Sequence, residues 1–73
     1  MGNLPYQPQS LVEIAYKALK KDITERVLAP GQKIIIREIN ERYGISETPI
    51  KQALNRLIAE GLVESIPRRG VRV

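Results

Sequence analysis

The stretch SETPIKQALNRLIAEG, residues 46–61, decides the fold that this sequence predicts. Ser46 suits the position before a helix, because its hydroxyl can accept a hydrogen bond from a backbone N–H of the first turn. Pro49 is tolerated in that turn, where an N–H has no partner within the helix to lose. Apolar residues follow at helical spacing and predict one buried face, closed off by a final glycine: Ile50, Ala53, Leu54, Leu57 and Ile58.

A shorter helix is expected just before this one, over residues 37–43, REINERY, with Ile39 turned inward. Gly44 would end it in the left-handed conformation, which glycine adopts without strain. At its start Ile35 stands where a polar cap is usual, and the missing acceptor costs about 1 kcal/mol unless burial of Ile35 offsets it. Two helices joined by a short turn that contains glycine form a helix-turn-helix.

The chain before this motif predicts one longer helix. Residues 1–9, with two prolines and no periodicity, are typical of a flexible lead-in. Ser10 and Glu13 have the spacing of a capping box, which predicts a helix from Ser10 to Leu28 that APGQ, residues 29–32, brings to an end. KIII, residues 33–36, is expected to be a short strand or an extended link. The apolar stripe of the long helix consists of Leu11, Ile14, Ala15, Ala18, Leu19 and Ile23.

The spacing of the apolar residues is no longer helical after residue 61. LVESI, residues 62–66, predicts a strand, PRRG, residues 67–70, a turn, and VRV, residues 71–73, a second strand. A helix-turn-helix followed by a hairpin with a basic tip is a winged helix-turn-helix. The expected fold class is therefore mainly α with a small β-hairpin: one domain over residues 10–73, with three helices and a two-stranded wing.

The composition excludes several classes of function. The 73 residues include no cysteine and no histidine, so disulfides and Cys/His metal sites are ruled out and the usual general base and thiol nucleophile are missing. We therefore expect no catalytic residue, no metal site and no enzyme. The isoleucine run Ile34–Ile36 is far shorter than the roughly 20 residues of a membrane helix, and no signal peptide is recognisable. The expected location is the cytoplasm.

The formal net charge of +4 is unevenly distributed. After Glu64 the charged residues are Arg68, Arg69 and Arg72, with no acid among them. A basic run of this kind is as typical of a solvated surface as of anion binding, so charge alone does not decide between the two. The aromatic residues are three tyrosines, which disfavours a single-strand binder, since such proteins stack bases on aromatic side chains.

Four segments together resemble the N-terminal DNA-binding domain of the GntR family of bacterial transcription regulators, and the PRRG wing is most similar to the FadR-like branch. The resemblance implies binding of double-stranded DNA at a two-fold symmetric operator, by a homodimeric full-length protein that represses or activates. It also implies a C-terminal domain, absent from this chain, that binds a small-molecule effector and drives dimerisation, and no cofactor in the domain present. The segments are VLAPGQKI (27–34), REINERYGIS (37–46), TPIKQALNRLIAEGLVE (48–64) and PRRGVRV (67–73).

The resemblance implies that the third helix enters the major groove. Glu47 and Lys51 stand where the family usually has arginine, so the helix reads SETPIK in place of Ser-Arg-Thr-Pro-x-Arg. A lysine can reach a phosphate or a guanine edge without the two-pronged fork of arginine, whereas a carboxylate can accept from the cytosine amino group. Glu47 also suits the positive end of a helix without any contact to DNA. The candidate DNA-binding residues of this helix are Ser46, Glu47, Thr48, Lys51, Gln52 and Asn55.

Four further candidates lie outside this helix. Arg37, at the start of the second helix, is expected to clamp a phosphate, with an ion pair to Glu41 as the alternative. Arg68 and Arg69 form the wing tip, where cations can enter or straddle a narrow minor groove, and Gly70 would let the backbone approach closely. For Lys51, Arg68 and Arg69, an ordinary solvated side chain is the other interpretation.

Two classes of function stay open. The first is a sequence-specific reader of duplex DNA. The second is a winged-helix protein-interaction module with weak or lost DNA binding, for which Glu47 is the best argument. Their dependence on salt would distinguish them, because phosphate contacts weaken steeply as the salt concentration rises.

Overall fold

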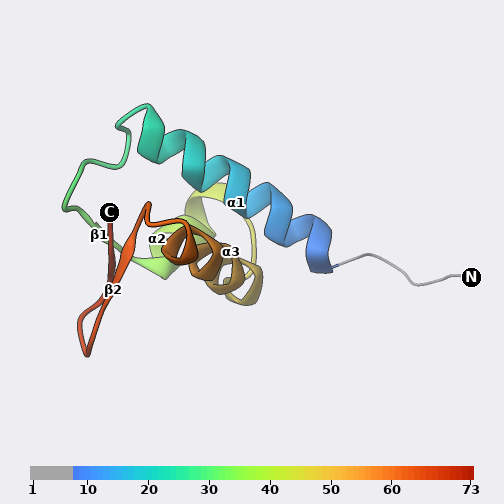
Figure 1. The fold of residues 1–73 in the computed structure, drawn as a ribbon. Helices are drawn as coiled ribbons and strands as arrows, with labels where there is room; N and C mark the ends of the chain where they lie inside the picture. The colour runs from blue at the N-terminus through green and yellow to red at the C-terminus, as the bar shows by residue number, and fades with distance from the viewer. Residues whose placement is uncertain (1–7) are drawn as a thin grey trace, which may run out of the picture.

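The computed structural model describes residues 8–73, with side chains from Leu11 onward, so residues 1–7 of the predicted lead-in lie outside the described residues. Figure 1 shows α1 lying across α3, with the β2–β3 hairpin projecting away from the helices. None of the described helices is long and apolar enough to cross a membrane. The elements in chain order are α1 (Pro8–Thr24), β1 (Lys33–Ile34), α2 (Ile36–Tyr43), α3 (Glu47–Ala59), β2 (Glu64–Ile66) and β3 (Gly70–Arg72).

The predicted fold class is confirmed, since the described chain has three helices and a small antiparallel sheet. β2 pairs with β3 as the predicted hairpin, with Ile66 opposite Gly70 beside the turn. The sheet also has a third strand, because residues 33 and 34 pair with Arg72 and Val71 and make β3 the central strand. The wing is therefore broader than a two-stranded hairpin, and β1 ties it to the segment that precedes α2.

The start of α1 differs from the prediction. The helix begins at Pro8, because proline is well accommodated in a first helical turn. Ser10 therefore lies inside the helix, and the predicted capping box of Ser10 with Glu13 is wrong. The predicted lead-in is shortened accordingly, since residues 8 and 9 are helical.

The end of α1 also differs, because the helix stops at Thr24 and does not reach Leu28. Arg26 takes a left-handed conformation, with φ 62°, just beyond the last turn. The Leu28 N–H then donates to the Asp22 carbonyl oxygen at 3.0 Å. This reversal returns the Leu28 side chain to the core, where it is buried.

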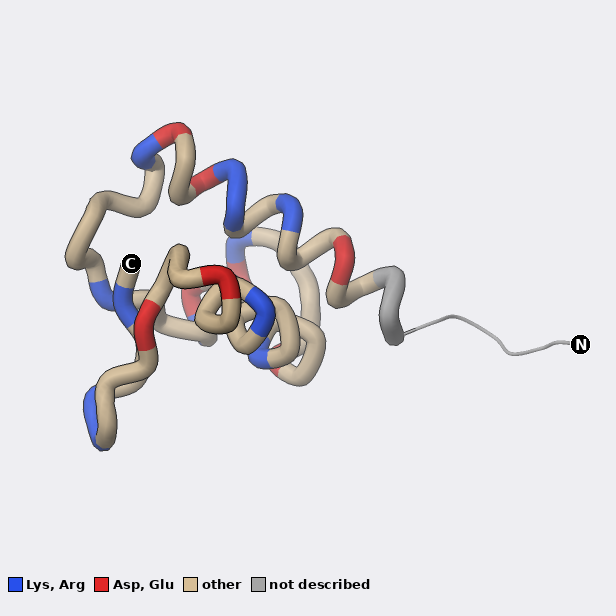
Figure 2. Tube along the Cα trace, viewed as in Figure 1, with Lys and Arg blue, Asp and Glu red and all other residues tan. Residues whose placement is uncertain are grey.

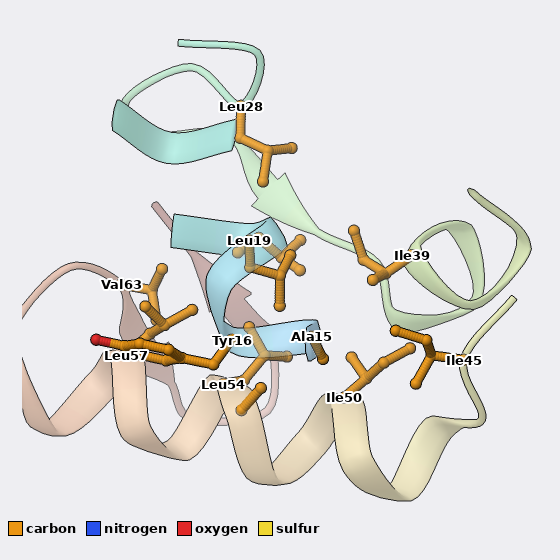
Figure 3. Close-up of a cluster of buried hydrophobic side chains, with 12 residues drawn as sticks. Ala15, Tyr16, Leu19, Leu28, Ile39, Ile45, Ile50, Leu54, Leu57 and Val63 are labelled. Atoms are coloured by element: carbon orange, nitrogen blue, oxygen red, sulfur yellow. The ribbon is translucent and has the colours of Figure 1, made fainter. Parts of the chain in front are cut away.

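The centre of the core lies between α1 and α3 (Figure 3). Ala15 and Leu19 of α1 and Ile50, Ala53 and Leu57 of α3 are fully buried, which confirms most of the predicted stripe on α3. The described residues place no polar or charged side chain in this core. The other members of this core are Tyr16, Leu28, Ile34, Ile39, Ile45, Leu54 and Val63.

Three members of the predicted stripe on α1 do not belong to the core. Leu11 is exposed, Ile14 is 55% exposed, and Ala18 is partly buried but lies outside the core cluster. Ala15, Leu19 and Ile23 define the side of α1 that faces the core. Ile14 lies about 100° around the helix from Ala15, on a side that no other element covers among the described residues.

The turn between α2 and α3 is built as predicted. Gly44 has a left-handed backbone (φ 68°), and its N–H donates to the Asn40 carbonyl oxygen at 2.8 Å. The Asn40 side-chain amide donates to the Ile45 carbonyl oxygen at 2.7 Å, which holds the turn against α2. At the other end of α2, Ile35 provides no side-chain cap, as predicted, but its side chain is 42% exposed, so the compensating burial considered above is not realised.

A polar contact fastens α2 to α1. The Tyr43 hydroxyl donates to the Asp22 carboxylate, and the Arg42 guanidinium lies 3.5 Å from the same carboxylate. Partial burial raises the pKa of Tyr43, and the hydrogen bond to Asp22 raises it further. Tyr43 therefore stays protonated and donates throughout the neutral range.

We expect the Leu19→Ala variant to lose about 2–5 kcal/mol of unfolding free energy, because it leaves a cavity between α1 and α3. Urea denaturation followed by circular dichroism measures this loss. The matched control Ile14→Ala removes an exposed apolar side chain and should change stability by only about 0.5 kcal/mol. Equal losses for the two variants would contradict the packing described here.

Candidate nucleic-acid interface

Helix α3 has one buried side and one exposed side. Successive residues of a helix are rotated by roughly 100° about its axis. By this rotation, five of the candidate residues lie within an arc of about 140° on the side opposite the core. All of these side chains are exposed, so the fold brings the predicted residues together on one accessible face: Glu47, Thr48, Lys51, Gln52 and Asn55. We call this the α3 face.

The start of α3 differs from the prediction in one hydrogen bond. Ser46 does occupy the N-cap position with an extended backbone, but its side chain makes no capping hydrogen bond. A capping hydroxyl accepts from the N–H of the second or third helical residue. Here the third helical residue is Pro49, which has no N–H, so one of the two possible partners is missing and only the N–H of Thr48 remains. The Ser46 hydroxyl is exposed and available to another group, beside Glu47 in the first turn.

A group of polar side chains fixes α3 against α1. The Tyr16 hydroxyl donates to the Glu60 carboxylate, with distances of 2.6 Å and 2.8 Å to its two oxygens. The Arg56 guanidinium lies over the Tyr16 ring, 3.9 Å from its centroid, and Arg56 Nη1 donates to Glu13 Oε1 at 2.7 Å. The hydrogen bond to Glu13 raises the pKa of Arg56. These contacts limit rotation of α3 about its own axis.

Sequence reasoning did not find this group. Arg56 lies on α3 next to the predicted contact residues, and in sequence it is one more basic residue of that helix. The sequence pattern places Glu13 in a capping box within α1 instead. Only the packing of α1 on α3 shows that the two residues are partners.

The wing tip is a tight turn that presents two arginines. The Arg69 N–H donates to the Ile66 carbonyl oxygen at 2.9 Å, with Pro67 and Arg68 between them. Arg68 has φ 63°, and a proline at the preceding position restricts the turn to type II. That position favours glycine or asparagine, so Arg68 holds a strained backbone. Figure 2 shows the resulting basic tip at the end of the hairpin.

A shallow hollow of about 350 Å³ lies at the side of the wing. It is open to solvent, and four of its seven lining residues are basic. Lys33 and Arg72 join the predicted Arg68 and Arg69 in its lining. The sequence offered one signal, because Lys33 precedes a buried Ile34 in a strand and so points outward, but its pairing with β3 was not predictable. The complete lining consists of Gly31, Lys33, Ile66, Arg68, Arg69, Val71 and Arg72.

The ion pairs within the described residues do not involve the cations that are predicted to contact DNA. They join Arg42 to Asp22, Arg56 to Glu13 and Arg72 to Glu64. The considered alternative for Arg37, an ion pair with Glu41, is not formed in this structure. The basic residues predicted to contact DNA are exposed and take part in no ion pair among residues 11–73: Arg37, Lys51, Arg68 and Arg69.

The described residues offer little for catalysis or metal binding. No group of three acidic, cysteine or histidine side chains is placed to hold a metal ion in the part of the chain that the structure describes. The accessible polar groups of the α3 face and the wing tip are cations, hydroxyls and amides, with Glu47 as the exception. Such groups bind phosphates and base edges.

Comparison with known proteins agrees with this arrangement. Residues 11–73 match the family "Bacterial regulatory proteins, gntR family". The chain is 35% identical over 65 residues to the uncharacterised HTH-type transcriptional regulator BphR of Paraburkholderia xenovorans (strain LB400), covering 89% of this chain and 26% of that protein. It is 32% identical over 66 residues to the HTH-type transcriptional repressor RspR of Escherichia coli (strain K12), covering 90% of this chain and 28% of that protein.

A solved structure supports the fold. The crystal structure of a GntR-family transcriptional regulator from Pseudomonas syringae pv. tomato str. DC3000 matches with a TM-score of 0.77 at 24% identity, covering 99% of this chain and 30% of that one. This chain spans about a quarter of the length of the curated relatives named above. With a family match from Leu11 to Val73, a helix-turn-helix and a wing, the chain belongs to the GntR family of bacterial regulatory proteins and forms its winged helix-turn-helix DNA-binding domain.

Proposed function

We propose that this domain reads double-stranded DNA with sequence preference, with α3 in the major groove and the wing at the minor groove. One observation carries the proposal. Among the described residues, the exposed cations without an ion pair include Arg37 on α2, Lys51 on α3 and Arg68 with Arg69 on the wing, the elements that contact DNA in this motif. Cations on all three of these elements can contact phosphates on both sides of a groove.

The α3 face supplies the base-reading groups. In this motif the N-terminal residues of the recognition helix contact base edges. Lys51 is suited to a phosphate or a guanine edge, and Ser46 and Thr48 to phosphate oxygens or a thymine methyl group. Gln52 and Asn55 carry amides that can pair with adenine, although Asn55 sits later in the helix and closer to the groove edge.

The other candidates position the domain. Arg37 begins the exposed side of α2, the helix that crosses the DNA backbone in this motif, and would bind a phosphate there. Arg68 and Arg69 would enter or straddle the minor groove. Gly70 has φ 96° and no side chain, so the wing backbone can approach the DNA closely.

Glu47 would give this domain a base preference that differs from the one an arginine at this position would give. Its carboxylate lies in the first turn of α3, where the helix dipole stabilises it and no ion pair neutralises it among the described residues. In a major groove it would accept from the cytosine amino group and repel nearby phosphates. We infer that it shifts the preferred half-site away from guanine and lowers affinity, with Lys51 and the wing arginines restoring part of the attraction.

The full-length protein would act as a homodimer in the cytoplasm on a two-fold symmetric operator, with half-sites about one helical turn apart. A further domain would bind a small-molecule effector and drive dimerisation. RspR is named a repressor, and we propose repression for this protein as well. The PRRG wing supports placement in the FadR-like branch.

We expect duplex binding by this domain to weaken steeply with salt. Neutralising about four phosphates gives a slope of log affinity against log salt of roughly −3 to −4, at about −0.9 per contact. Selection from a random pool of duplexes supplies the ligand, and fluorescence anisotropy at several salt concentrations measures the slope. A flat slope, or no binding to any duplex, would refute the proposal and favour a protein-interaction module.

The Glu47→Arg variant should bind DNA more tightly and prefer guanine at one position of each half-site, because arginine forms a two-pronged contact with guanine. Repeating the selection from random duplexes tests this preference. Glu25→Arg, at an exposed residue just beyond α1, makes the same change in charge and should leave base preference unchanged. If Glu47→Arg alters neither affinity nor preference, Glu47 is only a helix-start residue.

The Arg68→Asn variant should gain stability while losing affinity for DNA. Asparagine tolerates the left-handed backbone at this position, so unfolding should cost roughly 0.5–1 kcal/mol more. Thermal unfolding and anisotropy measure the two effects. The control Arg69→Asn removes the same charge from a residue without a positive φ. It should lose affinity for DNA without gaining stability. Unchanged stability of Arg68→Asn would show that the turn is not strained.

A further inference from the structure

The outer face of the wing brings together two cations that a folded protein would normally separate. Lys33 of β1 and Arg72 of β3 are directly opposite each other in the antiparallel register. Residues in such positions point to the same face of the sheet, and like charges there destabilise the pairing. Their neighbours Ile34 and Val71 take the other face and pack toward the core.

The Lys33 side chain lies along the wing toward its tip. A Cβ added at Gly70 would lie 3.8 Å from Lys33 Cε, so the end of the lysine stem passes beside Gly70. Gly70 directly follows Arg69 of the tip. Lys33 thereby extends the basic tip back along the wing and forms one continuous lining with Arg68, Arg69 and Arg72 around the hollow.

The charge of this lining is poorly compensated. Glu64 is opposite Arg72 on the other side, and its carboxylate accepts from Arg72 Nε at 3.0 Å. Lys33, Arg68 and Arg69 take part in no ion pair among the described side chains. Holding these cations around one hollow is unfavourable in the free domain, and the repulsion is relieved when an anion enters.

We propose that this outer wing face, formed by Lys33, Arg72 and the tip arginines, binds a backbone phosphate of the DNA strand that borders the minor groove. The inference rests on the proposed function, because it requires the wing tip at that groove. The minor groove is only about 6 Å wide, so a wing tip that enters it lies close to both strands. An open hollow with exposed walls suits a phosphate on a continuous backbone better than an enclosed small molecule.

Replacing Lys33 by glutamine tests this contact. Binding is measured with a mixed-sequence duplex of about two helical turns, since phosphate contacts act without regard to sequence. Lys33→Gln should bind several-fold more weakly and lower the salt slope by about one contact, with unchanged base preference in a selection from random duplexes. Lys17→Gln, at an exposed lysine of α1, which contributes no strand to the wing, should keep the wild-type slope.

Thermal unfolding of the free domain separates this role from a structural one. Lys33→Gln relieves the repulsion with Arg72, so its melting temperature should equal or exceed that of the wild type. Lys33→Arg should keep the wild-type salt slope. The inference is overturned if the wild type shows a steep slope and Lys33→Gln shows the same one. A flat slope for the wild type itself overturns the proposed function, and this inference with it.

Discussion

The packing of α1 against the buried side of α3 is the constraint on which the rest of the structure depends. Leu19 of α1 and Ile50 and Leu57 of α3 are the largest fully buried side chains, and their contact decides which side of α3 faces outward. The stacking of Arg56 on Tyr16 then limits rotation of the helix. Because α3 can neither slide nor turn freely, its exposed residues form a fixed surface.

The sequence predicts this arrangement well where periodicity carries the information. The stripe on α3, the left-handed Gly44 and the hairpin all follow from spacing and backbone preferences. The missing hydrogen bond of Ser46 was open to prediction only in part, since Pro49 removes one of the two N–H groups from which the hydroxyl could accept. The bounds of α1 were not, because the chain reversal at Leu28 depends on a tertiary position in the core.

Some features of the candidate site could likewise be predicted from the sequence, and others could not. Exposure of the residues on α3 could be predicted from their place opposite the apolar stripe, and exposure of Arg68 and Arg69 from the turn. The partners of Arg56, and the place of Lys33 opposite Arg72, could not, because each joins elements distant in sequence. The spacing of apolar residues within one element identifies its accessible face. Contacts between elements that are distant in sequence decide which charged residues lie together on that face.

The core contains no polar or charged side chain among the described residues, and none of the five residues of the α3 face contributes to it. Substitution on that face therefore has little effect on folding, whereas substitution on the buried side has a large one. The two sides of one helix can evolve at different speeds. Gene duplication followed by a few changes on the outer side would give regulators with separate target sites on an unaltered scaffold.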